Sequence, residues 1–145
     1  MDSAFILEWF RLADMDLALA DHALSLHPQP LEAICYHCQQ SAEKYLKGYL
    51  VYKGIVDPPR IHNLDSLCEM CEDFDAQFSK IMKPCSTLTD YGVQPRYPHE
   101  MEILESDMRK ALTHAKQIQE FEPLLAARQQ LKNEMQCENT SILTD

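Results

Sequence analysis

The fold is decided by the stretch Leu31–Lys53, LEAICYHCQQSAEKYLKGYLVYK. Its apolar residues recur every three or four positions, which predicts an α-helix that buries one face against other helices. These residues are Leu31, Ile34, Cys35, Cys38, Ala42, Tyr45, Leu46, Tyr49 and Tyr52. Gly54 follows at once and favours the end of the helix, because glycine readily adopts the left-handed conformation found after helix C-termini.

The opposite side of this helix carries a polar stripe. His37, Gln40, Lys44 and Lys47 are spaced three, four and three residues apart, so they share one side of the helix. Ammonium and imidazole groups on one stripe can donate to a phosphate or to carboxylates of a partner. The alternative is solvated surface, in which Glu43 pairs with Lys47 and contributes only about 0.3–0.5 kcal/mol.

Further amphipathic segments flank this helix on both sides. They predict helices over about residues 4–26, 63–71, 76–90, with Pro84 as a kink or break, and 99–123. In the first of them Asp16 falls among the apolar positions, where a carboxylate must be paired, protonated or at the rim. We therefore expect an all-α protein, an up-and-down bundle of four to five helices.

The chain is long enough for about one domain, and we assign residues 1–127 to the bundle. Residues 128–145 lose the apolar periodicity and turn polar, which predicts a disordered C-terminal tail. The first ten residues contain two acidic residues and no long apolar run, so we expect no signal peptide, no membrane span and a cytoplasmic protein.

Charge and cysteine content narrow the classes of function. The formal net charge of −10 argues against a protein that coats long nucleic acid by counterion release. Cys35-x-x-Cys38 and Cys68-x-x-Cys71 have the spacing of a four-cysteine zinc site, but both pairs lie inside apolar helical stripes, where cysteine is usually a small core residue. We expect reduced thiols, no metal and no cofactor.

Three segments, in this order along the chain, resemble the HEPN family. They are residues 35–47, CYHCQQSAEKYLK, residues 61–64, IHNL, and residues 96–98, RYP, and the resemblance extends over about residues 4–122. It implies a helical bundle that often forms homodimers, is associated with a minimal nucleotidyltransferase and is linked to nucleotide or RNA binding. The expected function is a non-catalytic binding domain in a toxin–antitoxin-type two-component system.

The resemblance and the polar stripe together give the candidate ligand-binding residues, which are His37, Gln40, Glu43, Lys44, Lys47, His62, Arg96 and Tyr97. His62 has a second interpretation, because it precedes Asn63, the expected cap of the next helix, and could serve only to set the helix start. Arg96 and Tyr97 could hold a phosphate and stack on a base, or Arg96 could anchor its loop by pairing with a carboxylate such as Asp16.

A ribonuclease toxin acting across a dimer is the alternative from a different class. The nuclease branch of the family carries an Arg, a gap of four to six residues and a His. Arg96 and His99 are too close together, whereas Arg109 and His114 have the right gap but lie about 140° apart around a straight helix. An interaction scaffold without a small ligand is the third hypothesis.

Overall fold

The computed structural model describes residues 2–92 and 102–144, with side chains described as far as residue 140. Within these ranges it contains six α-helices, three short 3₁₀ segments and no β-strand, so the all-α helical bundle is confirmed with more helices than expected. The elements are α1 Ser3–His22, η1 Ala23–Ser25, α2 Leu31–Tyr52, α3 Leu64–Glu72, η2 Ala76–Ile81, α4 Met82–Thr89, η3 Asp90–Gly92, α5 Glu105–Gln119 and α6 Glu122–Thr144.

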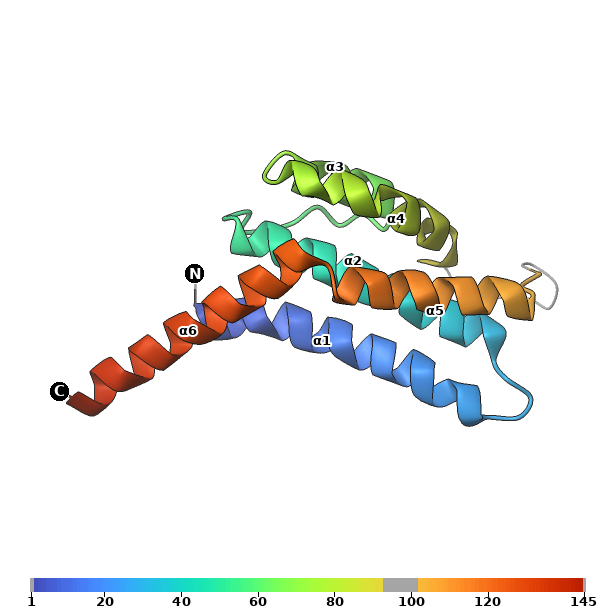
Figure 1. Ribbon diagram of the computed structural model, residues 1–145, viewed down its shortest axis with the longest axis horizontal. Helices are drawn as coiled ribbons and strands as arrows, with labels where there is room; N and C mark the ends of the chain where they lie inside the picture. The colour runs from blue at the N-terminus through green and yellow to red at the C-terminus, as the bar shows by residue number, and fades with distance from the viewer. Residues whose placement is uncertain (1, 93–101, 145) are drawn as a thin grey trace.

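Helices α1 and α2 form the long pair at the centre of the bundle, with α5 packed along them and α3 and α4 on the other side of α2 (Figure 1). Gly48 permits the close approach of α1 and α2. A Cβ atom at this position would lie 2.9 Å from the Cβ of Trp9 and 3.2 Å from the ring of Phe10. Because one of these atoms is fixed to the backbone, any larger residue would push the helices apart.

Helix α2 ends as the sequence predicts, at the glycine. Gly54 has a φ of 100°, its N–H donates to the carbonyl of Val51, and the N–H of Ile55 donates to the carbonyl of Leu50. This pair of bonds is the Schellman motif, which satisfies the last carbonyls of a helix. The chain then turns back, and the segment before α3 runs beside α2 (Figure 1).

The middle helices agree with the sequence in position and differ in one detail. The Asn63 side chain accepts from the N–H of Ser66 at 3.1 Å and caps α3. The predicted break near Pro84 lies earlier, where the 3₁₀ segment η2 gives way to α4 at Met82. Pro84 sits in the first turn of α4, a place where its missing N–H costs no helical hydrogen bond.

The C-terminal part of the chain corrects two predictions. The helix expected over residues 99–123 is divided into α5 and α6, and Pro123 lies in the first turn of α6 instead of ending a helix. The tail expected to be disordered from residue 128 is helical to Thr144, and Leu131 is buried. The physical reason is that residues 124–144 contain no Gly or Pro and many good helix formers.

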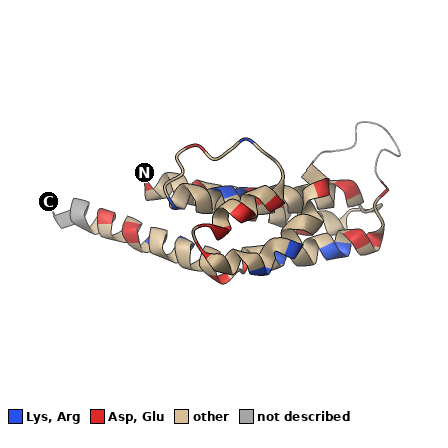
Figure 2. Cartoon of the chain, turned by 90° about the horizontal axis from the view of Figure 1, so that it is seen from above, with Lys and Arg blue, Asp and Glu red and all other residues tan. Residues whose placement is uncertain are grey.

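The end of α6 extends beyond the N-terminus of α1 and away from the bundle (Figure 1). Acidic residues lie along most of the chain, including this end of α6, whereas Lys and Arg are fewer (Figure 2). Among the described residues, 31 buried apolar side chains build the core between the helices, including Phe10, Tyr45 and Phe78. No helix in the described part of the chain is long and apolar enough to cross a membrane.

Candidate ligand-binding site

Asp16 bonds two residues of the predicted polar stripe of α2, His37 and Lys44. It comes from α1 and is 7% exposed, and its Oδ1 lies 2.9 Å from Nδ1 of His37 on α2. Its other oxygen accepts from the ammonium of Lys44, about two helical turns further along α2. Of the three outcomes expected for a carboxylate at position 16, which were paired, protonated or at the rim, the structure shows pairing.

Glu43 bonds a third residue of the stripe, Lys47, and also His62. It is 6% exposed and its Oε1 lies 2.8 Å from Nδ1 of His62, while Oε2 accepts from Nζ of Lys47 at 3.4 Å. His62 comes from the segment that returns along α2, and its ring is well exposed. Both interpretations of His62 apply, since it precedes the Asn63 cap and also bonds Glu43.

Gln39 belongs to the group around Glu43 and was missed by the sequence analysis. It is fully buried, donates to the backbone oxygen of His62 at 3.1 Å and accepts from the amide of Gln40 at 2.7 Å. A Cβ atom on Gly92 would lie 3.1 Å from its amide nitrogen, so the end of η3 abuts this glutamine. A signal was present in the sequence, because Gln39 lies one turn before Glu43 and next to the apolar face, where an amide needs partners.

We call these side chains the polar cluster; its members are Asp16, His37, Gln39, Gln40, Glu43, Lys44, Lys47 and His62. Both histidines bond a carboxylate through Nδ1, and a carboxylate only accepts, so Nδ1 carries the hydrogen and Nε2 is left for another group. Neither Nε2 atom has a hydrogen-bond partner within the described residues. Each imidazole is thus held through Nδ1, and Lys44, which bonds the same carboxylate as His37, has a partly exposed ammonium.

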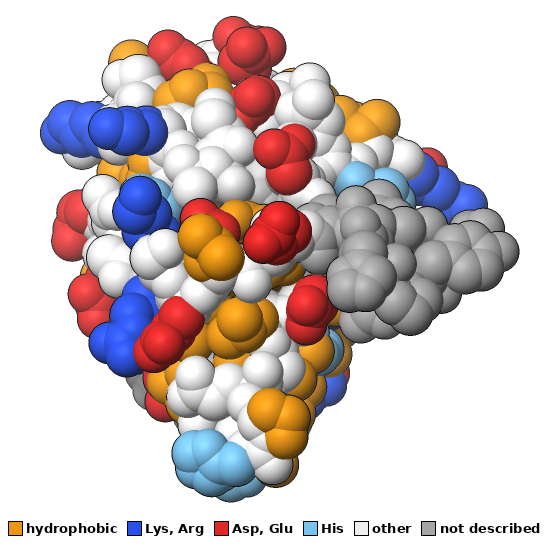
Figure 3. Space-filling view, turned by 90° about the vertical axis from the view of Figure 1, so that its right-hand side faces the viewer, with side chains coloured by type: hydrophobic (Ala, Val, Ile, Leu, Met, Phe, Trp, Pro, Cys, Tyr) orange, Lys and Arg blue, Asp and Glu red, His pale blue; other side chains and the backbone are white. Residues whose placement is uncertain are grey.

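Charge in the polar cluster differs from charge in the chain as a whole. Two carboxylates and two ammonium groups cancel, and each protonated histidine adds one positive charge. In a chain with a net charge of −10, this neutral-to-positive cluster can receive an anion. The end of the bundle near the α1–α2 turn instead mixes acidic, basic and hydrophobic side chains on one face (Figure 3).

The remaining predicted site residues fall into two groups. Arg96, Tyr97 and His99 lie outside the described residues. Arg109 and His114 both lie on α5, where Arg109 donates to Glu105 at 2.6 Å and is largely exposed, whereas His114 is half-buried with no hydrogen-bond partner for its buried Nδ1 among the described residues. Because α5 is one continuous helix, the two side chains leave it in directions about 140° apart.

The two Cys-x-x-Cys pairs are core residues. Cys35, Cys38, Cys68 and Cys71 are fully buried, and burial raises the pKa of both Cys35 and Cys38 to about 12, which keeps these thiols neutral. Cys71 donates to the carbonyl of Leu46 at 3.6 Å. Across residues 2–92 and 102–144, no group of three or more His, Cys, Asp or Glu side chains has an arrangement that could hold a metal ion.

A second polar network, centred on Asp14, was not predicted. Arg128 of α6 donates to both carboxylate oxygens of Asp14, at 3.1 and 2.5 Å, and the hydroxyl of Tyr45 and the amide of Gln119 also donate to it. Burial raises the pKa of Asp14, but these hydrogen bonds outweigh it, so the pKa lies below the ordinary value. We call this set the Asp14 network; it ties α1, α2, α5 and α6 together.

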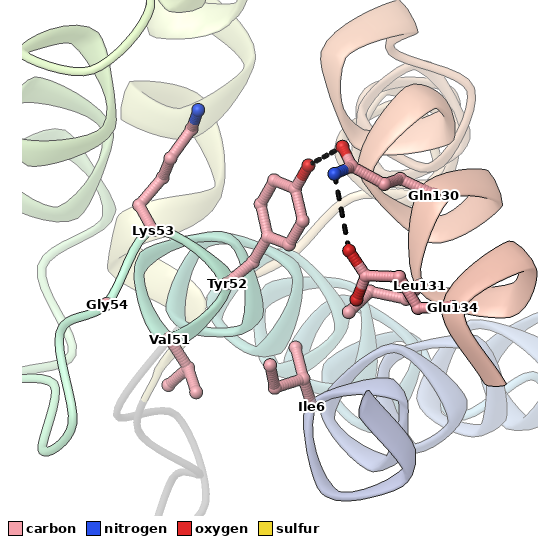
Figure 4. A pocket seen from close by; sticks show the side chains of 8 residues that line it. All are labelled: Ile6, Val51, Tyr52, Lys53, Gly54, Gln130, Leu131 and Glu134. Carbon is pink, nitrogen blue, oxygen red and sulfur yellow. Dashed lines mark hydrogen bonds between the residues drawn. The ribbon is translucent and has the colours of Figure 1, made fainter. Parts of the chain in front are cut away.

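A cleft of about 380 Å³ lies between the end of α2, the start of α1 and α6 (Figure 4). The Tyr52 hydroxyl donates to Gln130 across it, and Gln130 in turn donates to Glu134 at 3.3 Å. These bonds join α6 to α2, so the polar groups at the mouth of the cleft are already engaged in holding the helix. The cleft carries none of the predicted site residues.

Comparison with known proteins gives a family match over most of the chain. The model of the HEPN domain matches residues 6–125. A solved structure of an archaeal HEPN homologue is similar to this chain with a TM-score of 0.61 and 24% sequence identity, over 87% of this chain and 97% of the other. At this identity the likeness supports the fold alone. No curated protein matches the sequence.

Proposed function

The chain belongs to the HEPN family, and from that premise we propose that it binds a phosphate-bearing ligand, a nucleotide or the end of an RNA, at the polar cluster. The observation that supports this most is the pair of buried carboxylates, each bonded to a histidine Nδ1. This arrangement holds each ring through Nδ1 and leaves its Nε2 available to a ligand. A phosphate can accept from Lys44 and, when both nitrogens of a ring carry hydrogen, from the Nε2 of that imidazole.

The proposal assigns binding, and no reaction, to this chain. His37, Lys44 and His62 would contact the phosphate. Asp16 would orient His37 and Lys44, and Glu43 would orient His62. Gly92 touches Gln39, and Arg96 and Tyr97 follow Gly92 by four and five residues in the sequence. We therefore include Arg96 and Tyr97 in the proposed site. A protonated histidine would be stabilised by the bound anion.

We also propose that a minimal nucleotidyltransferase is the partner protein, as in toxin–antitoxin-type two-component systems. This rests on the family and on no contact in the structure. Mixing the chain with a minimal nucleotidyltransferase encoded beside it should give one complex on gel filtration. Separate elution of the two proteins at micromolar concentration would contradict the partnership and leave the ligand proposal intact.

Isothermal titration with ATP, adenosine and a 5′-phosphorylated oligoribonucleotide tests the ligand proposal. We expect heat of binding with the two phosphate-bearing ligands and none with adenosine. Lys44→Met should weaken binding about tenfold or more, because a charge-assisted hydrogen bond contributes about 1.5–3 kcal/mol. Lys116→Met is the matched control, since Lys116 also bonds a carboxylate of α1, Asp21, but lies outside the polar cluster.

Two results would replace this proposal with one of its alternatives. No heat at millimolar ligand would favour an interaction scaffold. Cleavage of RNA without metal, lost in His114→Ala, would favour the ribonuclease, for which the unpartnered buried Nδ1 of His114 is the one structural support in the described residues.

A further inference from the structure

A second cleft, of about 230 Å³, adjoins the cleft in Figure 4 and contains no residue of the polar cluster. Its walls come from the end of α2, the start of η2 and the start of α6, and the two clefts share Tyr52, Lys53 and Gln130. We call it the tyrosine cleft, because Tyr49 and Tyr52 line it with ring centroids 6.0 Å apart. Two aromatic rings in a small cleft form a surface that attracts a cation.

One cation of the chain already lies against these rings. Nζ of Lys53 is 5.8 Å from the ring centroid of Tyr49 and 5.5 Å from that of Tyr52, and at such distances an ammonium is attracted to an aromatic face. Lys53 is exposed, and its ammonium has no hydrogen bond or ion pair among the described residues. Because only solvent and the two rings hold this ammonium, a cation from outside the chain can take its place.

The hydroxyl of Tyr49 is a polar group that lacks a partner. Tyr49 is 3% exposed and lines the tyrosine cleft, and its hydroxyl forms no hydrogen bond within the described part of the chain. Burial, with a smaller contribution from the carboxylate of Asp75, raises the pKa of Tyr49 to about 12, so the hydroxyl keeps its hydrogen. Its oxygen can accept from an N–H donor, and polar groups in nearly buried residues are usually hydrogen-bonded. The cleft therefore suits a ligand that carries N–H donors.

Carboxylates outnumber ammonium groups around the two clefts. Asp75 and Glu122 line the tyrosine cleft, and Glu134 lines the cleft in Figure 4. Lys53 is the one ammonium among the described lining residues, so three carboxylates face one ammonium and the net charge is −2. Glu122 has no ion pair within the described residues, and the donors to Glu134 are a neutral hydroxyl and a neutral amide.

The carboxylates are spread along α6. Glu122 and Glu134 lie twelve positions apart on this helix, which corresponds to about 18 Å at 1.5 Å per residue. A calcium ion needs its oxygen ligands within about 2.6 Å of one centre, and carboxylates this far apart cannot supply them. Spaced carboxylates instead match a long, flexible cation that carries several separate positive charges.

From these observations we propose that the two clefts together bind an aliphatic polyamine. One ammonium group takes the place of Lys53 over the two tyrosine rings and donates to the hydroxyl of Tyr49. The aliphatic chain passes over the bond between Tyr52 and Gln130, and a second ammonium group pairs with Glu134. The site is separate from the polar cluster, whose residues line neither cleft, so it does not rest on the proposed function.

Titration with spermidine, n-butylammonium and tetramethylammonium, with potassium chloride holding the ionic strength constant, tests the proposal. Proton–carbon NMR of the tyrosine rings reports binding, and Tyr49→Phe and Tyr52→Phe assign the two resonances. We expect both resonances to shift and saturate with spermidine, while that of Tyr36, whose ring contacts His37 in the polar cluster, stays in place. Spermidine should bind about threefold or more tightly than n-butylammonium, and tetramethylammonium should bind more weakly than both, because it has no N–H donor.

Two results of this titration would overturn the proposal. Shifts that grow without saturation would show that the cations only screen the acidic surface. Equal affinity for spermidine and n-butylammonium would show that one ammonium group is sufficient, which contradicts a polyamine.

Two variants with opposite expected effects locate the ligand. Lys53→Met removes the competing ammonium, so spermidine should bind about threefold more tightly. Glu134→Gln should weaken the binding of spermidine about two- to threefold and leave that of n-butylammonium unchanged, because only the longer cation reaches Glu134. Circular dichroism verifies that both variants keep their helicity.

Lys116→Met and Glu105→Gln are the matched controls for these changes of charge. Both side chains are about half exposed and belong to α5, outside both clefts, so neither change should alter the affinity for spermidine. Effects in the controls as large as those of Lys53→Met and Glu134→Gln would mean that net charge alone attracts the polyamine, and would overturn the site. Because no phosphate-bearing ligand is present, these results are independent of the nucleotide titration.

Discussion

Asp14 and Asp16 lie two residues apart on α1, and each bonds a cation, yet they are held in different ways. Asp14 receives Arg128 of α6, Gln119 of α5 and Tyr45 of α2, so its partners come from three helices. Asp16 receives His37 and Lys44, both from α2 and both partly exposed. The first carboxylate joins parts of the chain 114 residues apart, and the second holds two side chains that solvent or a ligand can reach.

The difference separates a structural carboxylate from a candidate functional one. Donors fixed by several packed helices cannot leave Asp14 without moving those helices, whereas His37 and Lys44 can turn toward a ligand while α1 and α2 stay in place. The comparison predicts that changes in the Asp14 network reduce stability, and that changes around Asp16 reduce binding. The following experiments test it, from the largest expected effect to the smallest.

Tyr45→Ala should lower the free energy of unfolding by about 3–5 kcal/mol, because it removes a fully buried aromatic ring as well as a donor to Asp14. Tyr45→Phe keeps the ring and should cost only about 1 kcal/mol. Urea denaturation followed by circular dichroism measures both values. A cost below about 1 kcal/mol for Tyr45→Ala would mean that the network is not part of a rigid core.

Arg128→Met should lower the free energy of unfolding by about 1–3 kcal/mol, because it leaves Asp14 with neutral donors only. The effect should be local, with faster amide hydrogen exchange in α6 than in α2. Lys44→Met should cost about 1 kcal/mol or less, since His37 still bonds Asp16. Equal losses in the two variants would remove the distinction between the two carboxylates.

Acid should weaken the Asp14 network. The pKa of Asp14 is lowered on folding, so the unfolded chain binds more protons, and stability falls with pH as the solution passes through the ordinary Asp range near about 4 and below. Asp14→Asn cannot titrate and should show a shallower decline of Tm between neutral and acidic pH. Arg128→Met should show an intermediate slope. A slope in Asp14→Asn as steep as in the wild type would contradict the assignment.

Lys116→Met should have the smallest effect. Lys116 bonds Asp21 at 3.0 Å, but both side chains are about half exposed, and such surface pairs contribute about 0–1 kcal/mol. Neither stability nor nucleotide binding should change measurably. A loss of nucleotide binding in this variant would mean that charge anywhere on α1 and α5 matters, instead of the geometry around Asp16.

The sequence predicted those parts of the fold that depend on local patterns. The apolar spacing of residues 31–53 and the glycine after it gave α2 to within one residue, and Asn63 was expected as a cap. The path of α6 was not predictable in this way. Its buried Leu131 and its bonds to Asp14 and Tyr52 join positions distant in the sequence, so the periodicity around residues 128–140 alone looked like a solvated tail.

The candidate site was predictable only in part, for the same reason. Spacing placed His37, Gln40, Lys44 and Lys47 on one side of a helix facing away from the core, although the structure buries Lys47. It did not indicate that Asp16 and Glu43 each hold a histidine by Nδ1, because those bonds span 21 and 19 residues of sequence. Gln39 escaped notice because its bond to the backbone oxygen of His62 spans 23 residues of sequence.

Nitrogen-15 NMR of the histidine rings during titration with ATP tests the central claim directly. If the polar cluster receives the phosphates, the Nε2 resonances of His37 and His62 will shift together with added ATP, and both shifts will require about tenfold more ATP or more in Lys44→Met. ATP that binds while the rings of His37 and His62 keep their free-state resonances would contradict the claim.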